Sequence, residues 1–173
     1  MSFRSSDERT PATDEAVLCS IERSLTVLGE RWSPLILREL HYGNHTFSEI
    51  RNRLGIASNL LSKRLQALTA AGVVQQSAYR EPGARGRLRY ELTASGRDAL
   101  VILGAFQQWG DLHAPRAGGA TVLRRHGDTG APLHVAFVTD DGTAVPLDDV
   151  EMIVTPSARA QSAVELESDH LDT

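Results

Sequence analysis

Four polar residues recur at helical spacing in one short segment, where they could form hydrogen bonds with the edges of DNA bases. They lie three or four positions apart, so a helix places them on one face: Asn59, Ser62, Lys63 and Gln66. Asn and Gln can pair with adenine through two hydrogen bonds, whereas Lys and Ser discriminate less between bases. Ser58 completes the predicted base-contacting set. Taken alone, this face could also be an ordinary solvated helix surface.

Basic residues on both sides of this segment are suited to contact phosphate. A glycine-rich stretch after it carries arginines at alternate positions, which point to the same side of a β-hairpin. The predicted phosphate-contacting set is Thr46, Arg51, Arg53, Arg64, Arg85, Arg87 and Arg89. For Arg64 a structural role is an equal alternative, with Glu49 or the carbonyl groups of a helix end as its partner.

The charge is distributed unevenly along the chain. The net charge of the 173 residues is −4, but residues 31–97 hold eleven basic and four acidic residues, a net charge of +7. From residue 140 onward, nine acidic residues accompany one arginine, a net charge of −8. A basic region attracts phosphate whatever the total charge of the chain. The central region therefore favours a nucleic-acid partner.

Cys19 is the single cysteine, which excludes an internal disulfide. It lies near the start of a helix predicted over residues 16–28, about 160° around the helix from Ile21 and so off the apolar stripe. The helix dipole favours a thiolate there, whereas Glu22 opposes it. Cys19 is therefore either a small residue packed at a subunit interface or a sensor of oxidants and electrophiles. A sensor would pair with Cys19 of a second subunit or with a small thiol.

No enzymatic motif is found in the sequence. It contains no His-Glu-x-x-His, nucleophile elbow or phosphate-cradling loop, and its histidines form no cluster along the chain. We therefore expect neither catalysis nor a cofactor. There is also no 18-residue apolar run and no signal-like N-terminus, so we expect a cytoplasmic protein without a membrane partner.

Two helix-start signals precede the polar segment. Ser33 followed by Pro34 predicts an N-cap and first residue for a helix over residues 34–42. Thr46 and Glu49 form a capping box, in which each side chain accepts a hydrogen bond from the other residue's amide. A short helix should therefore begin directly after Thr46.

A tight turn leads from that short helix to the polar one. Gly55 should close the first helix, and Ser58 is the predicted N-cap of the second. The second helix presents three leucines to the core: Leu61, Leu65 and Leu68. Strands over 73–80 and 88–92 then form a hairpin, or wing. The order helix, turn, helix and wing favours DNA contact over a merely solvated face.

The helix predicted over residues 94–113, capped by Thr93, is apolar on nearly every side. Such a helix must be buried on every side, and one small winged domain can cover only one. A second copy is the simplest cover, so we predict a homodimer. The predicted interface residues are Leu100, Leu103, Phe106 and Trp109. Phe106 and Trp109, together with Trp32, could instead be core residues or line a ligand cavity.

After a linker at 115–119 the pattern changes to β. Strands are predicted over 121–125, 133–139 and 151–154, with a hairpin turn at Asp141-Gly142. The predicted organisation is a flexible N-terminus (1–14), a winged helix-turn-helix and dimerisation domain (15–114), a small β extension (120–156) and an acidic disordered tail (157–173). The fold class is mainly α with a small β-wing (α+β).

An ordered series of motifs resembles the HxlR-type winged helix-turn-helix transcription regulators, relatives of the MarR group. The motifs are Cys19-Ser-Ile-Glu-Arg23, Leu28-Gly-Glu-Arg-Trp32-Ser-Pro-Leu-Ile-Leu37-Arg-Glu-Leu40, Phe47-Ser-Glu-Ile-Arg51, Leu61-Ser-Lys-Arg-Leu65, Leu68-Thr-Ala-Ala-Gly72-Val-Val and Tyr90-Glu-Leu-Thr93-Ala-Ser-Gly96. The resemblance implies a dimer built from the first and last helices, a recognition helix at 58–71 and a wing at 80–89. Some members sense oxidants or electrophiles through the cysteine that matches Cys19.

The extension adds a second resemblance, to C-terminal hairpin pairs of zinc-ribbon type. The segments 126–130 and 138–142 stand where the turns of such a ribbon would carry cysteines, and neither contains one. The resemblance implies a ribbon that has lost its metal.

These observations predict a homodimeric regulator that binds double-stranded DNA in a sequence-specific manner, as a repressor or an activator. Two subunits imply a pseudo-palindromic operator with half-site centres about 34 Å or a multiple apart. A small-molecule or electrophile effector is left open. The alternative is a winged-helix module for protein interaction that binds no DNA and uses its acidic tail as the functional surface.

Overall fold

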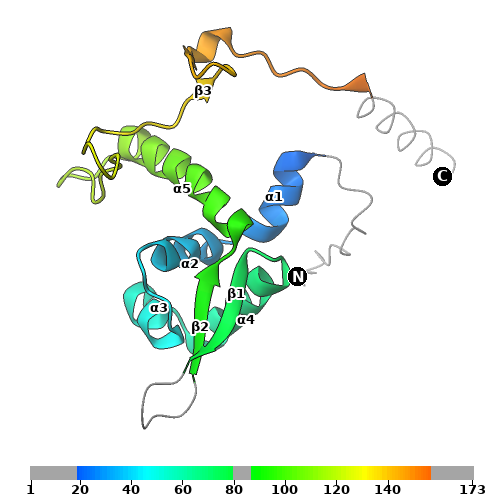
Figure 1. Ribbon diagram of the computed structural model, residues 1–173, viewed down its shortest axis with the longest axis vertical. Helices are drawn as coiled ribbons and strands as arrows, with labels where there is room; N and C mark the ends of the chain where they lie inside the picture. Colours follow the sequence, from blue (N-terminus) through cyan, green and yellow to red (C-terminus); the bar gives the residue numbers. More distant parts are fainter. Residues whose placement is uncertain (1–18, 80–86, 157–173) are drawn as a thin grey trace, which may run out of the picture. The chain divides into compact units, whose positions relative to one another are not determined.

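The structure, a computed structural model, describes residues 19–79 and 87–156 (Figure 1). They divide into two compact units: residues 24–136 form one, and the residues before 24 together with those from 137 onward form the other. The helices are α1 (Ser20–Leu28), α2 (Trp32–His41), α3 (Phe47–Leu54), α4 (Ser58–Ala70), α5 (Ala94–His113) and the 3₁₀ turn η1 (Leu147–Asp149). The strands are β1 (Val74–Tyr79), β2 (Arg87–Leu92), β3 (Phe137–Val138) and β4 (Ala144–Val145).

The core of the larger unit lies between α2, α3, α4 and the first part of α5. Its fully buried side chains are Ile36, Leu37, Ile50, Leu61, Leu65, Leu68 and Val74. The three leucines of α4 are buried as the sequence pattern predicted. Burying a side chain of this size stabilises the fold by about 1.5–3 kcal/mol. These residues fix the inner face of α4 and so determine which of its residues point outward.

The capping box of α3 is confirmed. The Thr46 side chain accepts a hydrogen bond from the Glu49 amide, and the Glu49 carboxylate accepts one from the Thr46 amide. Gly55 ends the helix in the left-handed conformation, with φ of 63°, which only glycine adopts at little cost. The turn between α3 and α4 therefore has the predicted form.

Two predicted N-caps are wrong. Ser33 lies inside α2 and is buried, because a tight turn, in which the Ser33 amide donates to the Glu30 carbonyl at 2.8 Å, starts the helix at Trp32. Pro34 still lies in the first turn, where its missing N–H costs no hydrogen bond. Ser58 is the first residue of α4, and Ala57, which has no side-chain acceptor, occupies the N-cap.

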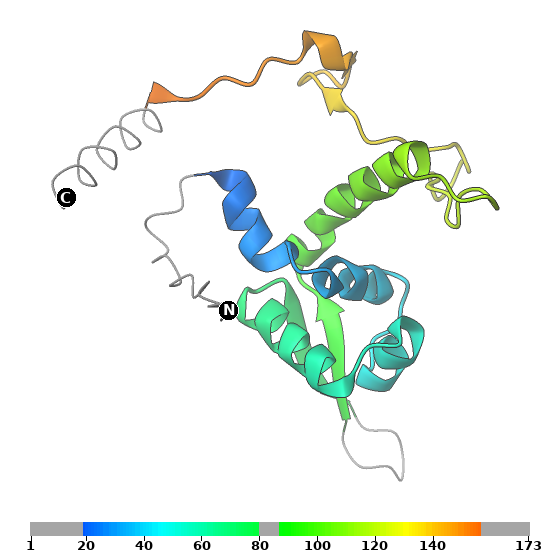
Figure 2. The same cartoon turned by 180° about the vertical axis from the view of Figure 1, so that it is seen from behind.

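The wing is an antiparallel pair, with Val74 opposite Leu92 and Tyr79 opposite Arg87. A third short segment joins it, because Thr46 forms a bridge with Arg89 and the Tyr90 amide donates to the His45 carbonyl at 2.8 Å. The start of α3 is therefore hydrogen-bonded to the wing. In both views the end of β1 and the start of β2 lie at the same end of this unit as the N-terminal part of α4 (Figures 1 and 2).

Helix α5 is only partly buried within one chain. Gly96 and Ala99 are buried, and Leu103 packs against the core. Thr93 caps the helix by accepting a hydrogen bond from the Gly96 amide at 3.2 Å, as predicted. Six large apolar side chains of the helix are nevertheless exposed: Leu100, Val101, Ile102, Phe106, Trp109 and Leu112.

The chain beyond α5 contacts a second side of that helix. The Gln108 side chain forms two hydrogen bonds with the backbone of Val135, one to its carbonyl at 2.9 Å and one from its amide at 3.0 Å. Gln107 donates to the Val122 carbonyl at 2.7 Å. Gly104 lies beneath this segment, since a Cβ there would stand 3.0 Å from the Val135 side chain. The two ends of the segment 122–135 are therefore docked on α5.

The predicted β content of the extension is largely wrong. Only Arg125 and Pro132 form a bridge in the first predicted pair, and β3 and β4 are two residues each. Residues 151–154 form no strand. The turn at Asp141-Gly142 is confirmed between β3 and β4, with Gly142 at φ of 86°. The apolar residues here are mostly exposed, so no core supports longer strands.

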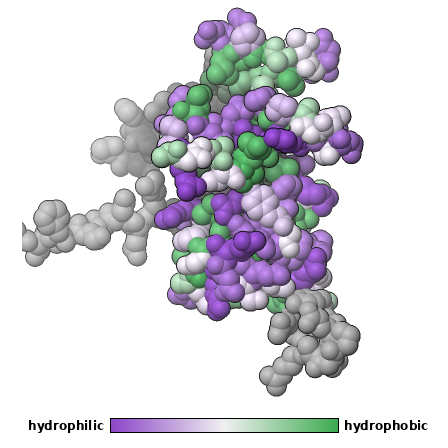
Figure 3. All heavy atoms as spheres, turned by 90° about the vertical axis from the view of Figure 1, so that its left-hand side faces the viewer, coloured by the Kyte–Doolittle hydropathy of each residue, from purple (hydrophilic) through white to green (hydrophobic). Residues whose placement is uncertain are grey.

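Figure 3 shows one face of the molecule, on which hydrophobic side chains form several small patches among hydrophilic ones. Hydrophobic side chains do not form a continuous covering on that face. No helix among the described residues is both long and apolar enough to cross a membrane.

Candidate nucleic-acid interface

Helix α4 presents a polar face opposite its buried leucines. Asn59, Lys63 and Gln66 are exposed, as is Ser58 at the start, and Ser62 is half-buried. At 100° per residue, Asn59, Lys63 and Gln66 lie within about 60° of one another. The structure thus brings together most of the residues that the sequence pattern grouped.

The exposed amides and amine on this face differ in their availability. The Asn59 side-chain oxygen accepts a hydrogen bond from the Leu60 amide at 2.9 Å, in the first turn of a helix whose N-cap, Ala57, offers no side-chain acceptor. Lys63 and Gln66 have no hydrogen bond or ion pair within the part of the chain that the structure describes. Their polar groups are therefore available to an external partner.

Cations also flank the helix-turn-helix. Arg51 and Arg53 are exposed on the last turn of α3, and Arg51 donates to the Asn52 side chain at 3.3 Å. The Thr46 hydroxyl is used by the capping box, as is the Glu49 carboxylate. The Thr46 backbone amide is the main cause that lowers the pKa of Glu49. Thr46 could contact phosphate only while it also caps α3.

The wing carries the remaining predicted cations. Arg89 forms an ion pair with Glu91 at 3.1 Å, with both side chains substantially exposed. Arg87 is placed only by its backbone pairing with Tyr79, and Arg85 lies outside the described residues. The alignment of the three arginines on one side of the hairpin tip stays a prediction.

Arg64 differs from the other candidates. Its Nη2 atom lies 2.9 Å from Glu30 Oε2, and only 17 % of its side chain is exposed. The proposed pairing with Glu49 is wrong, because Glu49 is occupied by its own capping box. Sequence reasoning missed Glu30, which lies 34 positions away on the connection between α1 and α2. No periodic signal links residues so far apart.

Cys19 is exposed and forms no disulfide. It directly precedes α1, and its carbonyl accepts a hydrogen bond from the Arg23 amide at 3.0 Å, as an N-cap residue does. The position at a helix start is confirmed; a role as sensor stays a prediction.

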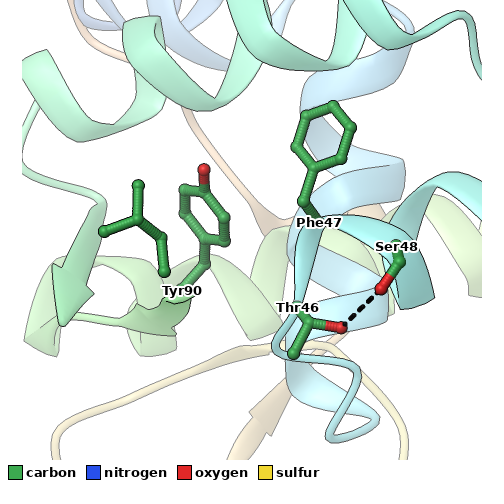
Figure 4. A pocket seen from close by; sticks show the side chains of 5 residues that line it. Thr46, Phe47, Ser48 and Tyr90 are labelled. Carbon is green, nitrogen blue, oxygen red and sulfur yellow. Dashed lines mark hydrogen bonds between the residues drawn. The ribbon is translucent and has the colours of Figure 1, made fainter. Parts of the chain in front are cut away.

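A hollow of about 500 Å³ lies between the start of α3 and β2. The Phe47, Leu88 and Tyr90 side chains form its apolar walls, and the Thr46 and Ser48 hydroxyls, 3.3 Å apart, are its polar part. The rings of Phe47 and Tyr90 point to the same side (Figure 4), and burial raises the pKa of Tyr90. None of Trp32, Phe106 and Trp109 lines it, so it is not the cavity considered from the sequence.

Metal-binding side chains do not gather in the described ranges 19–79 and 87–156, where no group of three or more His, Cys, Asp or Glu could hold an ion. In the first extension turn, the His126 ring nitrogen Nδ1 accepts a hydrogen bond from the Asp128 amide at 3.2 Å. In the second turn, the Asp141 carboxylate accepts a hydrogen bond from the Thr143 amide at 3.1 Å. The pKa of Asp141 is lowered, mainly by the hydrogen bond from the Thr139 hydroxyl. Side chains of the turns thus supply acceptors for their own amides.

A helix-turn-helix with a hydrogen-bonded wing and a polar face on its second helix defines the winged helix-turn-helix class. A model of the HxlR-like helix-turn-helix family matches residues 27–117, and the chain belongs to that family. The match covers α2 to α5 and both strands of the wing.

Several related proteins are described as transcriptional regulators. The chain is 37 % identical over 107 residues to the uncharacterized HTH-type regulators Mb3122 of Mycobacterium bovis and Rv3095 of Mycobacterium tuberculosis. This match covers 62 % of the chain and 66 % of each relative, just under two thirds of their length. YtcD of Bacillus subtilis is 32 % identical over 122 residues, which cover 70 % of the chain and 89 % of YtcD.

Two solved structures resemble the fold over most of the chain. PA1607, described as a candidate transcription factor, has a TM-score of 0.68 and 29 % identity, covering 82 % of this chain and 98 % of its own. PA1374 from Pseudomonas aeruginosa, similarly described, has a TM-score of 0.57 and 36 % identity, covering 81 % of this chain and 94 % of its own.

Proposed function

We propose that the protein is a transcriptional regulator that binds a pseudo-palindromic DNA site as a homodimer. In each subunit α4 would lie in a major groove, with the wing and the arginines of α3 against the flanking phosphates. The HxlR-like family and the regulators named among the relatives support this class of function.

The observation that carries the proposal is the polar face of α4. Lys63 and Gln66 point away from a core of fully buried leucines, and neither has a partner within the described residues. Gln and Asn can hydrogen-bond adenine in two places, and Lys can donate to guanine. A merely solvated face would not require the helix-turn-helix and wing that hold it in place.

The homodimer is proposed from the third side of α5. One side packs on the winged domain through Ala99, and a second side carries residues 122–135, docked through Gln108. The side left over exposes Ile102, Phe106, Trp109 and Leu112. A contiguous exposed apolar surface marks an interaction site, and two copies of the helix could cover each other. Of the four predicted interface residues, Leu103 packs on its own core and is left out of this contact, whereas Leu100, Phe106 and Trp109 are exposed.

A salt-titrated binding assay on the DNA upstream of the protein's own gene tests the function. For duplex DNA, log K falls with log salt by about 0.9 for each phosphate contact. Each arginine used by both subunits should therefore contribute about 1.8 to the slope. A footprint of two half-sites with a steep salt dependence is the expected result.

The same assay identifies the alternative. A protein-interaction module would bind no DNA even at low salt. That result would refute the proposed function. Retardation of every sequence alike would refute only its sequence specificity. An unrelated duplex of equal length is the control for both outcomes.

A further inference from the structure

One basic residue of α4 faces neither the core nor the free face. Arg64 lies about 60° around the helix from Leu61, so it stands between the buried face and the free polar face. Its guanidinium meets Glu30, at 2.9 Å between Nη2 and Oε2. The side chain of Arg64 is 17 % exposed and that of Glu30 is 56 % exposed, so the arginine is the more buried partner.

The environment of the guanidinium makes this partner necessary. Arg64 Nε is buried and has no hydrogen-bond partner among the described residues. A buried charge is costly unless it is paired. Without the Glu30 carboxylate, the guanidinium would have to turn toward water. Arg64 is the neighbour of both Lys63 and Leu65 in the chain. The movement would therefore shift α4 and the face that carries Lys63.

Glu30 is held in place by its own backbone. Its carbonyl accepts the hydrogen bond from the Ser33 amide that starts α2, and Ser33 is buried. Just before it, Val27 and Leu28 at the end of α1 pack against the core. The ion pair therefore joins the middle of α4 to the connection between α1 and α2.

We propose that Arg64 is a positioning residue for DNA recognition, which acts through Glu30 to set the orientation of α4 and links it to the end of α1. This inference rests on the proposed function. It replaces the idea that Arg64 binds phosphate directly. The two roles predict opposite effects of removing Glu30: a positioning role predicts weaker specific binding, whereas a phosphate contact freed from its carboxylate would bind DNA more tightly.

The test uses the full chain with Glu30→Gln, Arg64→Gln and the double variant. Affinities for the footprinted site and for an unrelated duplex are measured across a salt series, with thermal melts to confirm folding. Each single variant should lower specific affinity about tenfold and leave nonspecific affinity and the salt slope unchanged. The double variant should lose no more than either single one, because coupled residues are not additive.

Two control variants measure the effect of losing a single charge on DNA binding. Glu22→Gln removes the same charge from an exposed position of α1 and shows what the loss of a negative charge does by itself. Arg53→Gln removes an exposed cation of α3 and should reduce the salt slope by about 1.8 if both subunits use it. The double variant, which leaves no unpaired charge, serves as the decisive protein if Glu30→Gln alone fails to fold.

The proposal is overturned if Glu30→Gln strengthens or preserves specific binding, or if Arg64→Gln lowers specific and nonspecific affinity together with the salt slope. Specific loss in the double variant that equals the sum of two independent single losses also overturns it. A wild type that binds no DNA refutes the proposed function itself, and the two failures are thus distinguishable.

Discussion

Thr46 and Glu49 hold each other through two hydrogen bonds, one from the Thr46 amide to Glu49 Oε2 at 2.8 Å and one from the Glu49 amide to Thr46 Oγ1 at 3.3 Å. The same carboxylate oxygen accepts the His45 amide at 3.0 Å. Because Thr46 also bridges to Arg89, this pair fixes the start of α3 and its attachment to the wing together.

Replacing Thr46 by Ala should destabilise the fold by about 1 kcal/mol, the typical cost of a lost N-cap. Urea unfolding followed by circular dichroism measures the change. Ser48→Ala is the matched control, since among the described residues its hydroxyl makes only the 3.3 Å contact with Thr46. The stability of this variant should change little. Equal losses in both variants would show that the cap is not the cause.

Lys63→Ala combined with Gln66→Ala should abolish specific DNA binding and leave the oligomeric state intact, because both side chains point outward from α4. Footprinting and size-exclusion chromatography provide the two measurements. Arg97→Ala, which removes an exposed cation from α5, should keep the wild-type footprint. An unchanged footprint in the double variant would refute the assignment of α4 to the groove.

A charge at Trp109 should disrupt the proposed dimer. Trp109 is 64 % exposed within one chain, so Trp109→Glu leaves the subunit fold intact while placing a carboxylate in the subunit contact. Sedimentation velocity should show a monomer. Leu123→Glu changes a residue that is 65 % exposed on the docked extension and should remain dimeric; a dimer of the Trp109 variant would rule out this face.

Cys19→Ser tests the sensor interpretation. If Cys19 responds to oxidants, diamide or hypochlorite should change the DNA affinity of the wild type and not that of the variant. Non-reducing electrophoresis would show whether two subunits become linked. A wild type that does not respond, or a variant that still does, would refute the sensor interpretation.

Two glycines of α5 should respond to alanine in opposite directions. A Cβ at Gly96 would lie 2.2 Å from the Val73 carbonyl oxygen, whereas one at Gly110 meets nothing within 4 Å. Gly96→Ala should therefore destabilise the fold strongly, and Gly110→Ala should stabilise it by up to about 1 kcal/mol through helix propensity. Thermal melts of the two variants measure this; a stabilising Gly96→Ala would contradict the close packing of α5 against Val73.

Local sequence patterns predicted the helix-turn-helix formed by α3 and α4 well. The Thr46 capping box, the glycine that closes α3 and the leucine spacing of α4 each act within a few residues, so the sequence alone reveals them. The long helix after Thr93 was predicted for the same reason. The polar face of α4 followed directly, because the buried leucines fix its opposite side.

Features that depend on distant residues were missed. Ser33 has the sequence of an N-cap, but packing buries it and the helix begins earlier. Glu30 became the partner of Arg64 only through the packing of α4 on the α1–α2 connection. The β-rich composition after residue 120 gave one isolated bridge and two strands of two residues each, because the residues there are mostly exposed and no core supports longer strands.

The docking of residues 122–135 on α5 also affects where the chain can be truncated without exposing apolar surface. The family match ends at residue 117, yet Gln107, Gln108 and Gly104 contact chain beyond that boundary. A fragment trimmed to the shared module would uncover this side of α5 beside its already exposed apolar side. Such a fragment should be prone to aggregate, and its association behaviour would be a poor guide to that of the full chain.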